Sequence, residues 1–397
     1  MIIVENIFLT VIFWIVGIPV NSATVPRLFI FYNLFIYVIS LTNCAFFLYQ
    51  IIGLGDNNIS LFIELTRSFT GLLQLILIHL NRSKWIQVYS NINQYINLEE
   101  IEIVKKSSNK FALLLIGLLA FEIYSWVQTG TVDELFRFFY GPLWSLNFES
   151  KLILLCVTMI CRILVIHGVV YASVIFYLCS YYRLHLLYNK FHQKISTQAS
   201  DNSVPKKQLK TITPVIEELP YYYHLFRIRI GWIRLSSIKR SLESSLNALP
   251  AVWFGRYLFE SFLCLFRANR TIPSGNAVTL HYLVDKFTLF TNITILLIVL
   301  INLVDKITLT DLKLSNYIMD MSNESLDSAV YYSTTNVHKI RAIYESILIK
   351  SELLRVSYVP ITIFHIIEIR RAFIPTYINT LIPMVVMALD FAENYSF

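Results

Sequence analysis

The sequence predicts an all-α, polytopic membrane protein with seven transmembrane helices, an N-terminus inside, a C-terminus outside and a cytoplasmic helical anchor layer. Composition is the first reason: the 397 residues are 56% hydrophobic and only 15% charged, whereas soluble domains are about 25% charged. Length is the second, because several apolar runs reach the roughly 20 residues that a helix needs to cross a bilayer. A large, very apolar soluble protein is the alternative, and these long runs argue against it.

Seven segments are long and apolar enough to be spans. They are residues 28–52, 60–80, 111–130, 152–180, 247–266, 284–304 and 372–391. The fifth and seventh are the least apolar. Residues 1–27 lack the basic region that opens a signal peptide and carry Glu5 instead, so we expect a retained cytoplasmic or interfacial segment and not a cleaved leader.

The distribution of basic residues predicts the orientation. Three long loops, about 81–110, 181–246 and 305–371, together carry 24 Lys and Arg residues, whereas the three short loops carry 4. Cytoplasmic loops hold the excess of Lys and Arg in membrane proteins. The long loops are therefore expected inside, which is the reverse of the orientation of a G-protein-coupled receptor.

The chain is accordingly expected to have four regions. Residues 1–27 form the N-terminal segment, 28–304 a six-span bundle, 305–371 a cytoplasmic helical anchor, and 372–397 the seventh span with its end. Apolar positions recur every three to four residues in 217–246 and 336–356, which predicts helices in the inner loops.

Catalytic and metal-binding signatures are missing from the sequence. All five cysteines fall in apolar runs, with no spacing that indicates a disulfide framework or a metal site. No phosphate-binding glycine loop or nucleophile elbow occurs. We therefore expect no enzyme activity, no cofactor and no nucleic-acid partner.

Several ionisable side chains fall within the predicted spans, where they are costly and usually face protein or water. Glu64 and Arg67 are three positions apart, and Arg256 and Glu260 are four apart, so each pair shares a helix face and can form an ion pair. Structural pairing and a role in a polar ligand pocket are both open. His167 can likewise be a hydrogen-bonded core histidine or a ligand contact.

Aromatic and polar groups together suit a small-molecule pocket, although the same aromatics suit an interfacial belt. The candidate pocket residues are Tyr124, Trp126, Trp144, Glu122, Arg162, His167, Arg256 and Glu260. Two glycosylation sequons lie in loops expected outside, at Asn58 and Asn269, and such matches also arise by chance.

Asp390 lies near the outer end of the seventh predicted span. A carboxylate there can simply reach the headgroups. Around the axis of an oligomer, it would instead form an acidic ring of the kind that concentrates cations in pores. Val386 and Leu389 nearby could form a hydrophobic constriction.

The segment 365–391, HIIEIRRAFIPTYINTLIPMVVMALDF, resembles the C-terminal signature of insect gustatory receptors, which belong to the insect chemosensory receptor superfamily. Ile369, Arg371 and Phe391 match that signature. Pro383-Met384 replaces its Thr-Tyr pair, and Asp390 replaces the Gln before the final Phe. The chain length and the long inner loops resemble the same family.

The resemblance implies a taste-type receptor that acts as a ligand-gated, non-selective cation channel in the plasma membrane of sensory neurons. It implies a homotetramer, or an assembly with related subunits, in which each seventh helix lines a central pore. It also implies a ligand pocket in the outer half of the 28–304 bundle. The pore and gate residues would be Asp390, Phe391, Val386 and Leu389. A non-conducting seven-span receptor or scaffold is the alternative, and a G-protein-coupled receptor or transporter is a weaker one.

Overall fold

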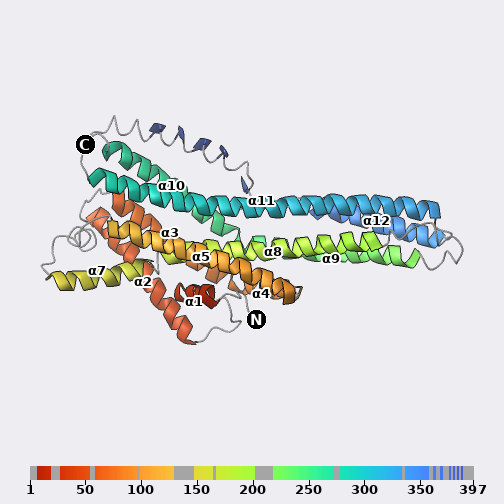
Figure 1. Ribbon diagram of the computed structural model, residues 1–397, viewed down its shortest axis with the longest axis horizontal. Helices are drawn as coiled ribbons and strands as arrows, with labels where there is room; N and C mark the ends of the chain where they lie inside the picture. Colours follow the sequence, from red (N-terminus) through yellow and green to blue (C-terminus); the bar gives the residue numbers. More distant parts are fainter. Residues whose placement is uncertain are drawn as a thin grey trace.

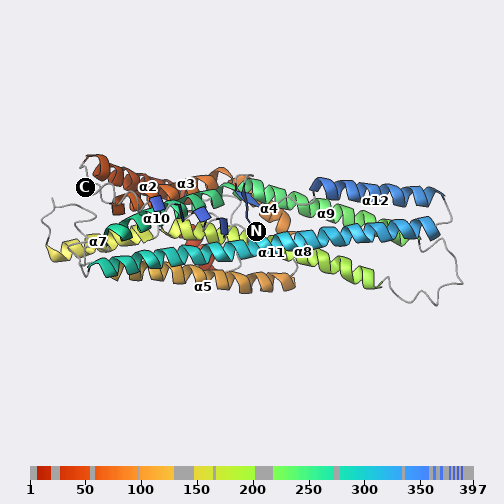
Figure 2. The same ribbon diagram turned by 90° about the horizontal axis from the view of Figure 1, so that it is seen from above.

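Long helices run side by side along the molecule in the computed structural model (Figures 1 and 2). Its described residues are 7–18, 27–53, 59–95, 98–128, 147–163, 167–201, 218–271, 278–332 and 336–356, with shorter pieces between 361 and 387. One half combines α1 (Ile7–Ile15), α2 (Arg27–Gly53), α3 (Ile59–Leu80), α5 (Leu98–Gln128), α7 (Phe148–Arg162) and α10 (Ala248–Thr271).

The other half is an elongated bundle of four helices (Figure 1). It is formed by the distal parts of α8 (Gly168–Asp201), α9 (Glu218–Leu246) and α11 (Val278–Tyr332), together with α12 (Asn336–Val356). The short α4 (Arg82–Asn93) packs against α9 and α8 near the junction of the two halves. At about 1.5 Å per residue, α11 is roughly 80 Å long and passes through both halves.

Two of the described helices satisfy the length and hydropathy requirements of a membrane span, by composition alone. They are Phe29–Ile52 on α2 and Leu61–Leu80 on α3. These boundaries lie within one residue of the predicted spans 28–52 and 60–80, because predominantly apolar runs define both helices, although the second run also contains Glu64 and Arg67. The number of spans and the sides of the termini stay predictions.

The fourth predicted span, 152–180, is divided between α7 and α8. Gly168 stands at the start of α8, where a Cβ atom would lie 2.9 Å from the carbonyl oxygen of Ile163 and 3.1 Å from Val16 Cγ1. Such distances are too short for a side chain. The glycine therefore allows the two helix ends and α1 to approach each other closely.

The N-terminal helix α1 is part of the packed interior. Leu9, Phe13 and Val16 are buried in the main apolar cluster. The helix ends in a Schellman motif, in which Ile18 N–H donates to Phe13 O and Gly17 N–H donates to Trp14 O. Gly17 has a φ of +84°, a conformation that glycine adopts without steric cost.

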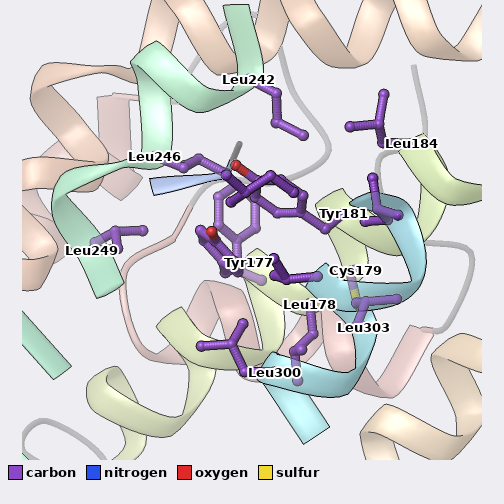
Figure 3. Packing of buried hydrophobic residues seen from close by; sticks show 14 of the residues in the cluster. Tyr177, Leu178, Cys179, Tyr181, Leu184, Leu242, Leu246, Leu249, Leu300 and Leu303 are labelled. Carbon is purple, nitrogen blue, oxygen red and sulfur yellow. The ribbon is translucent and has the colours of Figure 1, made fainter. Parts of the chain in front are cut away.

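The main core follows the inner faces of the long helices. Figure 3 shows Tyr177, Leu178 and Leu184 of α8 meeting leucines of α9, α10 and α11. Leu242 and Leu246 come from α9, Leu249 from α10, and Leu300 and Leu303 from α11. One apolar cluster therefore joins helices from both halves of the molecule.

The expected helical anchor, 305–371, contains one element that is not helical. The strands β1 (Thr362–Ile363) and β2 (Ile367–Glu368) pair antiparallel, with Thr362 opposite Glu368. Ile369 N–H also donates to Ile361 O at 2.9 Å. Both isoleucines at this end are buried, and β1 lies against α10, so the apolar run 357–369 packs on the bundle in part as a hairpin.

Candidate functional site

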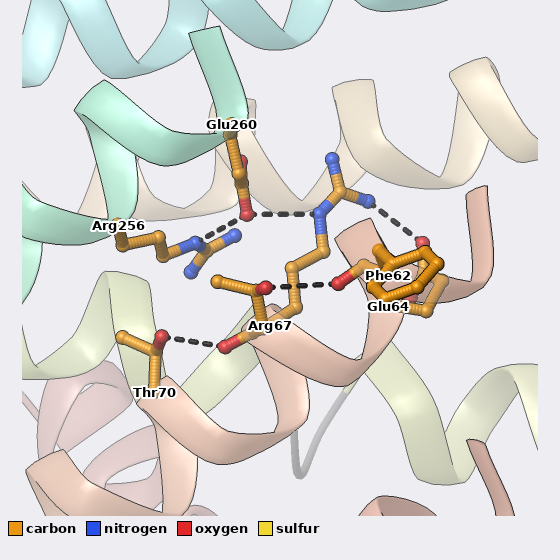
Figure 4. A network of polar contacts seen from close by, with 7 residues as sticks. Phe62, Glu64, Arg67, Thr70, Arg256 and Glu260 are labelled. Carbon is orange, nitrogen blue, oxygen red and sulfur yellow. Dashed lines mark hydrogen bonds and ion pairs between the residues drawn. The ribbon is translucent and has the colours of Figure 1, made fainter. Parts of the chain in front are cut away.

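A buried charge network connects α3 to α10 (Figure 4). Arg67 Nη1 lies 3.0 Å from Glu64 Oε1, and Arg256 Nε lies 2.7 Å from Glu260 Oε1. Both ion pairs predicted from the sequence are therefore present. Arg67 Nε also donates to Glu260 Oε1 at 3.2 Å, which joins the two pairs into one network.

The four side chains of this network are almost completely removed from solvent, with exposed fractions of 2–4%. Two carboxylates and two guanidinium groups balance in charge, which lowers the large cost of burying each one alone. His167 is fully buried as well, and its imidazole is close enough to Glu260 to interact with it electrostatically. Residues of α3, α10 and the start of α8 thus meet at one polar centre.

A second polar cluster joins α3, α8 and α10 through Gln74, Ser173 and Trp253. The Ser173 hydroxyl on α8 lies 2.9 Å from Gln74 Oε1 on α3, and Trp253 Nε1 on α10 donates to Ser173 Oγ at 3.1 Å. All three residues are buried. These contacts bind α3, α8 and α10 to one another at a second level of the bundle.

Aromatic side chains cover this second polar cluster. The Tyr177 and Tyr181 rings lie 4.3 Å apart between centroids, and the Tyr177 and Trp253 rings meet edge to face at 5.2 Å. Tyr177, Gln74 and Ser173 were not among the residues predicted from the sequence to form a site. An available signal was the aromatic run FYLCSYY at 176–182, which we interpreted only as an apolar span.

A small cavity of about 50 Å³ lies beside Arg256 between α8, α10 and α11. Tyr171, Trp253, Tyr257 and Leu300 are among its lining residues. Pockets that hold drug-sized molecules are usually about 300 Å³ or larger. In this conformation the cavity can therefore hold only a very small group, and a larger ligand would need the helices to separate.

Only part of the predicted pocket gathers around this cavity and the charge network. Arg256 and Glu260 belong to the network and His167 lies close to it. Tyr124, by contrast, is 58% exposed. Trp144 and the side chains of Glu122, Trp126 and Arg162 lie outside the described residues.

The predicted pore and glycosylation residues are described only in small part. Val386 is helical and 50% exposed, whereas Leu389, Asp390 and Phe391 lie outside the described residues, as does Asn58. Asn269 was expected in a loop. It is instead in the last turn of α10, because no proline occurs between Pro250 in the first turn of this helix and Pro273.

A larger cavity, of about 560 Å³, lies elsewhere in the molecule. It is bordered by the end of α4 and by α8 and α9, and Lys190 and Arg234 are among its lining residues. The sequence analysis did not single out these residues as a site, because they are far apart in the chain and were assigned only to an inner loop.

No model of a known protein family matches the sequence, and no curated protein matches it by sequence. The structure, however, is similar to that of the insect olfactory receptor OR5 from Machilis hrabei, with a TM-score of 0.63 over 96% of each chain. The chain has the fold of an insect olfactory receptor. Sequence identity is 9%, so the olfactory-receptor match is a match of fold, and no site residue is transferred from it.

The fold implied by the resemblance of the C-terminal residues agrees with this match, at the level of the fold alone. The match covers 96% of both chains and therefore includes both the apolar half and the elongated bundle.

Proposed function

We propose that this protein is a chemosensory receptor that acts as a ligand-gated, non-selective cation channel, with seven spans and a cytoplasmic N-terminus. The observation that carries the proposal is the fold shared with an insect olfactory receptor along 96% of both chains. The C-terminal signature favours taste-type over olfactory ligands, and sensory neurons as the site of expression.

A membrane location is supported by the surface of α2. Its apolar span is only 22% buried, compared with 61% for the span on α3. Large exposed side chains such as Phe31, Leu34 and Phe35 cover its outer side. A continuous apolar surface of this kind is expected to contact lipid or protein and not water.

Assembly into a homotetramer, or with related subunits, is supported by an uncovered stripe on α12. Val337, Ile340, Tyr344 and Ile347 are 57–69% exposed, and their spacing of three, four and three places them on one helix face. The opposite face of α12 packs on α9 and α11. A symmetric assembly would cover this stripe and place the seventh helix, with Asp390, near the common axis.

The charge network is the proposed centre of ligand recognition. Under the predicted topology, Arg67 and Glu260 fall in the outer half of α3 and α10. The cavity beside Arg256 adjoins Tyr171, Trp253 and Tyr257, so a polar group of a small ligand could exchange contacts with the guanidinium. A ligand that fits better when α3 and α10 lie further apart would then shift the population toward that conformation.

The test is whole-cell current from a heterologous cell that expresses the full chain, across a broad panel of taste and odour compounds. We expect a ligand-evoked cation current whose permeability ratios or pH response change in Asp390→Asn and stay the same in Glu102→Gln. Surface-labelled receptor that stays silent with the whole panel would favour the non-conducting receptor or scaffold. A current unaltered by Asp390→Asn would show that Asp390 does not line the pore.

A further inference from the structure

The large cavity between α4, α8 and α9 has a strongly one-sided charge. Among the described residues that line it, four are cationic, Lys190, Lys194, Arg227 and Arg234, and none is acidic. Lys190 Nζ donates to the backbone oxygen of Tyr95 at 2.6 Å, which fixes this ammonium group at the end of α4. Clustered cations in a concave site attract anions and raise their local concentration.

The remaining lining is mostly apolar. Leu187, Phe191 and Ile195 come from α8, and Ile228 and Leu235 from α9. A Cβ atom at Gly231 would lie 2.4 Å from Phe191 Cε2, so the phenylalanine ring rests directly on the α9 backbone and forms part of one wall. A small inorganic anion would leave these apolar walls unused, whereas an amphiphile would cover them.

The cavity also lies at a suitable depth for a lipid headgroup. Its α8 residues run from Leu187 to Ile195, which is about 10–20 Å along the helix from residue 180, the last of the fourth predicted span. The polar layer on each side of a bilayer is roughly 5–8 Å deep. A phosphorylated headgroup that projects beyond this layer can reach the near end of the cavity, at Leu187, and the first acyl carbons then enter its mouth.

We propose that this cavity binds an anionic phospholipid of the cytoplasmic leaflet, one with a multiply phosphorylated inositol headgroup. Lysine and arginine donate charge-assisted hydrogen bonds to phosphate oxygens, and four cations suit more than one phosphate. The glycerol and first acyl carbons contact Phe191 and the isoleucines. The bound lipid connects α4 to α8 and α9 at the junction of the apolar half and the elongated bundle.

The experiment measures binding of a dioctanoyl phosphoinositide bisphosphate to the purified full chain in detergent, by native mass spectrometry. The cavity variant is Lys194→Gln/Arg234→Gln, and the matched control is Lys313→Gln/Arg240→Gln. All four side chains are exposed, so both variants are expected to fold. We expect the dissociation constant to rise about tenfold or more in the cavity variant and to change less than about threefold in the control.

Two further measurements on the unaltered protein locate the site and identify the source of the phosphate. A photoactivatable phosphoinositide is expected to label peptides that contain 187–195 or 227–238. Soluble inositol trisphosphate is expected to bind at least about tenfold more weakly than the lipid, because it does not use the apolar walls. Equal losses of phosphoinositide affinity in the cavity and control variants, or labelling of other peptides, would overturn the proposed site. Equally tight binding of inositol trisphosphate would overturn the lipid assignment. The outcome is independent of any channel current.

Discussion

Arg67 Nε on α3 lies 3.2 Å from Glu260 Oε1 on α10, although the two residues are 193 positions apart in the chain. Glu260 Oε1 also accepts from Arg256 Nε. A single carboxylate oxygen therefore lies between two guanidinium groups in the interior of the bundle. Loss of the Glu260 carboxylate would therefore remove both the Arg256 ion pair and the contact that joins the two pairs.

The first prediction concerns Glu260→Gln. Loss of this carboxylate leaves Arg67 and Arg256 close together in a buried site with Glu64 as the remaining acid, and breaking a buried pair costs about 3–5 kcal/mol. We expect a lower melting temperature of the detergent-solubilised receptor and reduced surface delivery. Glu102→Gln, on the exposed side of α5, is the control, and equal melting temperatures for the two variants would contradict the prediction.

The second prediction concerns Gly17→Ala. A Cβ atom at this position would lie 2.7 Å from Asn33 Oδ1, and φ is +84°. The left-handed conformation costs a residue with a Cβ atom about 1–2 kcal/mol, so we expect a measurable loss in the free energy of unfolding. Gly117→Ala on α5 is the matched control, because nothing lies within 4 Å of its added Cβ. It should be neutral or stabilising by up to about 1 kcal/mol.

The third prediction concerns the ion pair of Lys239 on α9 with Asp311 on α11, which are both buried. Asp311→Leu alone leaves the ammonium group buried without this partner and should cost about 3–5 kcal/mol. Lys239→Met/Asp311→Leu replaces the whole pair with apolar groups and should recover most of that loss. Thermal unfolding of both variants measures the difference, and a double variant no more stable than the single one would refute the argument.

The fourth prediction concerns pH and His185, on α8 beyond the fourth predicted span. Burial, and then the nearby charge of Lys306, lower the pKa of its imidazole. Asn189 Nδ2 lies 3.1 Å from Nε2, which suits the neutral ring as acceptor. Between its lowered pKa and about 6.5 the unfolded chain binds more protons, so stability falls as the pH drops through this range.

Melting temperatures measured from pH 7.5 down to the acid limit of the sample, about pH 5, test this prediction. The fall in melting temperature should be smaller in His185→Gln than in the unaltered protein. His192→Gln, about two turns further along α8, is the control. Equal pH profiles for the unaltered protein and His185→Gln would exclude His185 as the titrating group.

The fifth prediction concerns the exposed stripe on α12. A charge at Ile340 or Ile347 would have to be desolvated if the stripe is covered by another subunit. Ile340→Glu/Ile347→Glu should therefore shift the proposed tetramer to monomer in mass photometry, with little change in melting temperature. Lys350→Glu on the same helix is the control. A tetramer that survives the double substitution would place the subunit contacts elsewhere.

Some elements could be predicted closely from the sequence. The predicted spans 28–52 and 60–80 agree with α2 and α3 because turns and polar residues end both apolar runs. The sixth span was predicted to end at residue 304, before the charged Asp305 and Lys306, whereas α11 continues to Tyr332. Its helical period continues after these charges, and the elongated bundle supplies partners such as Lys239 for Asp311.

Composition and hydrophobic periodicity by themselves predicted a helical, very apolar chain with basic long loops, and the described residues outside β1, β2 and short turns are helical. Local order along the chain also determined the pairs Glu64–Arg67 and Arg256–Glu260, because neighbours on one helix turn meet without help from the rest of the fold. Only the tertiary structure decided that these pairs join into one network, that Gly168 lies against Val16 of the N-terminal segment, and that four cations surround one cavity. The physical reason is that such contacts join residues tens to hundreds of positions apart. Their distances are set by the packing of whole helices, which the local sequence pattern does not encode.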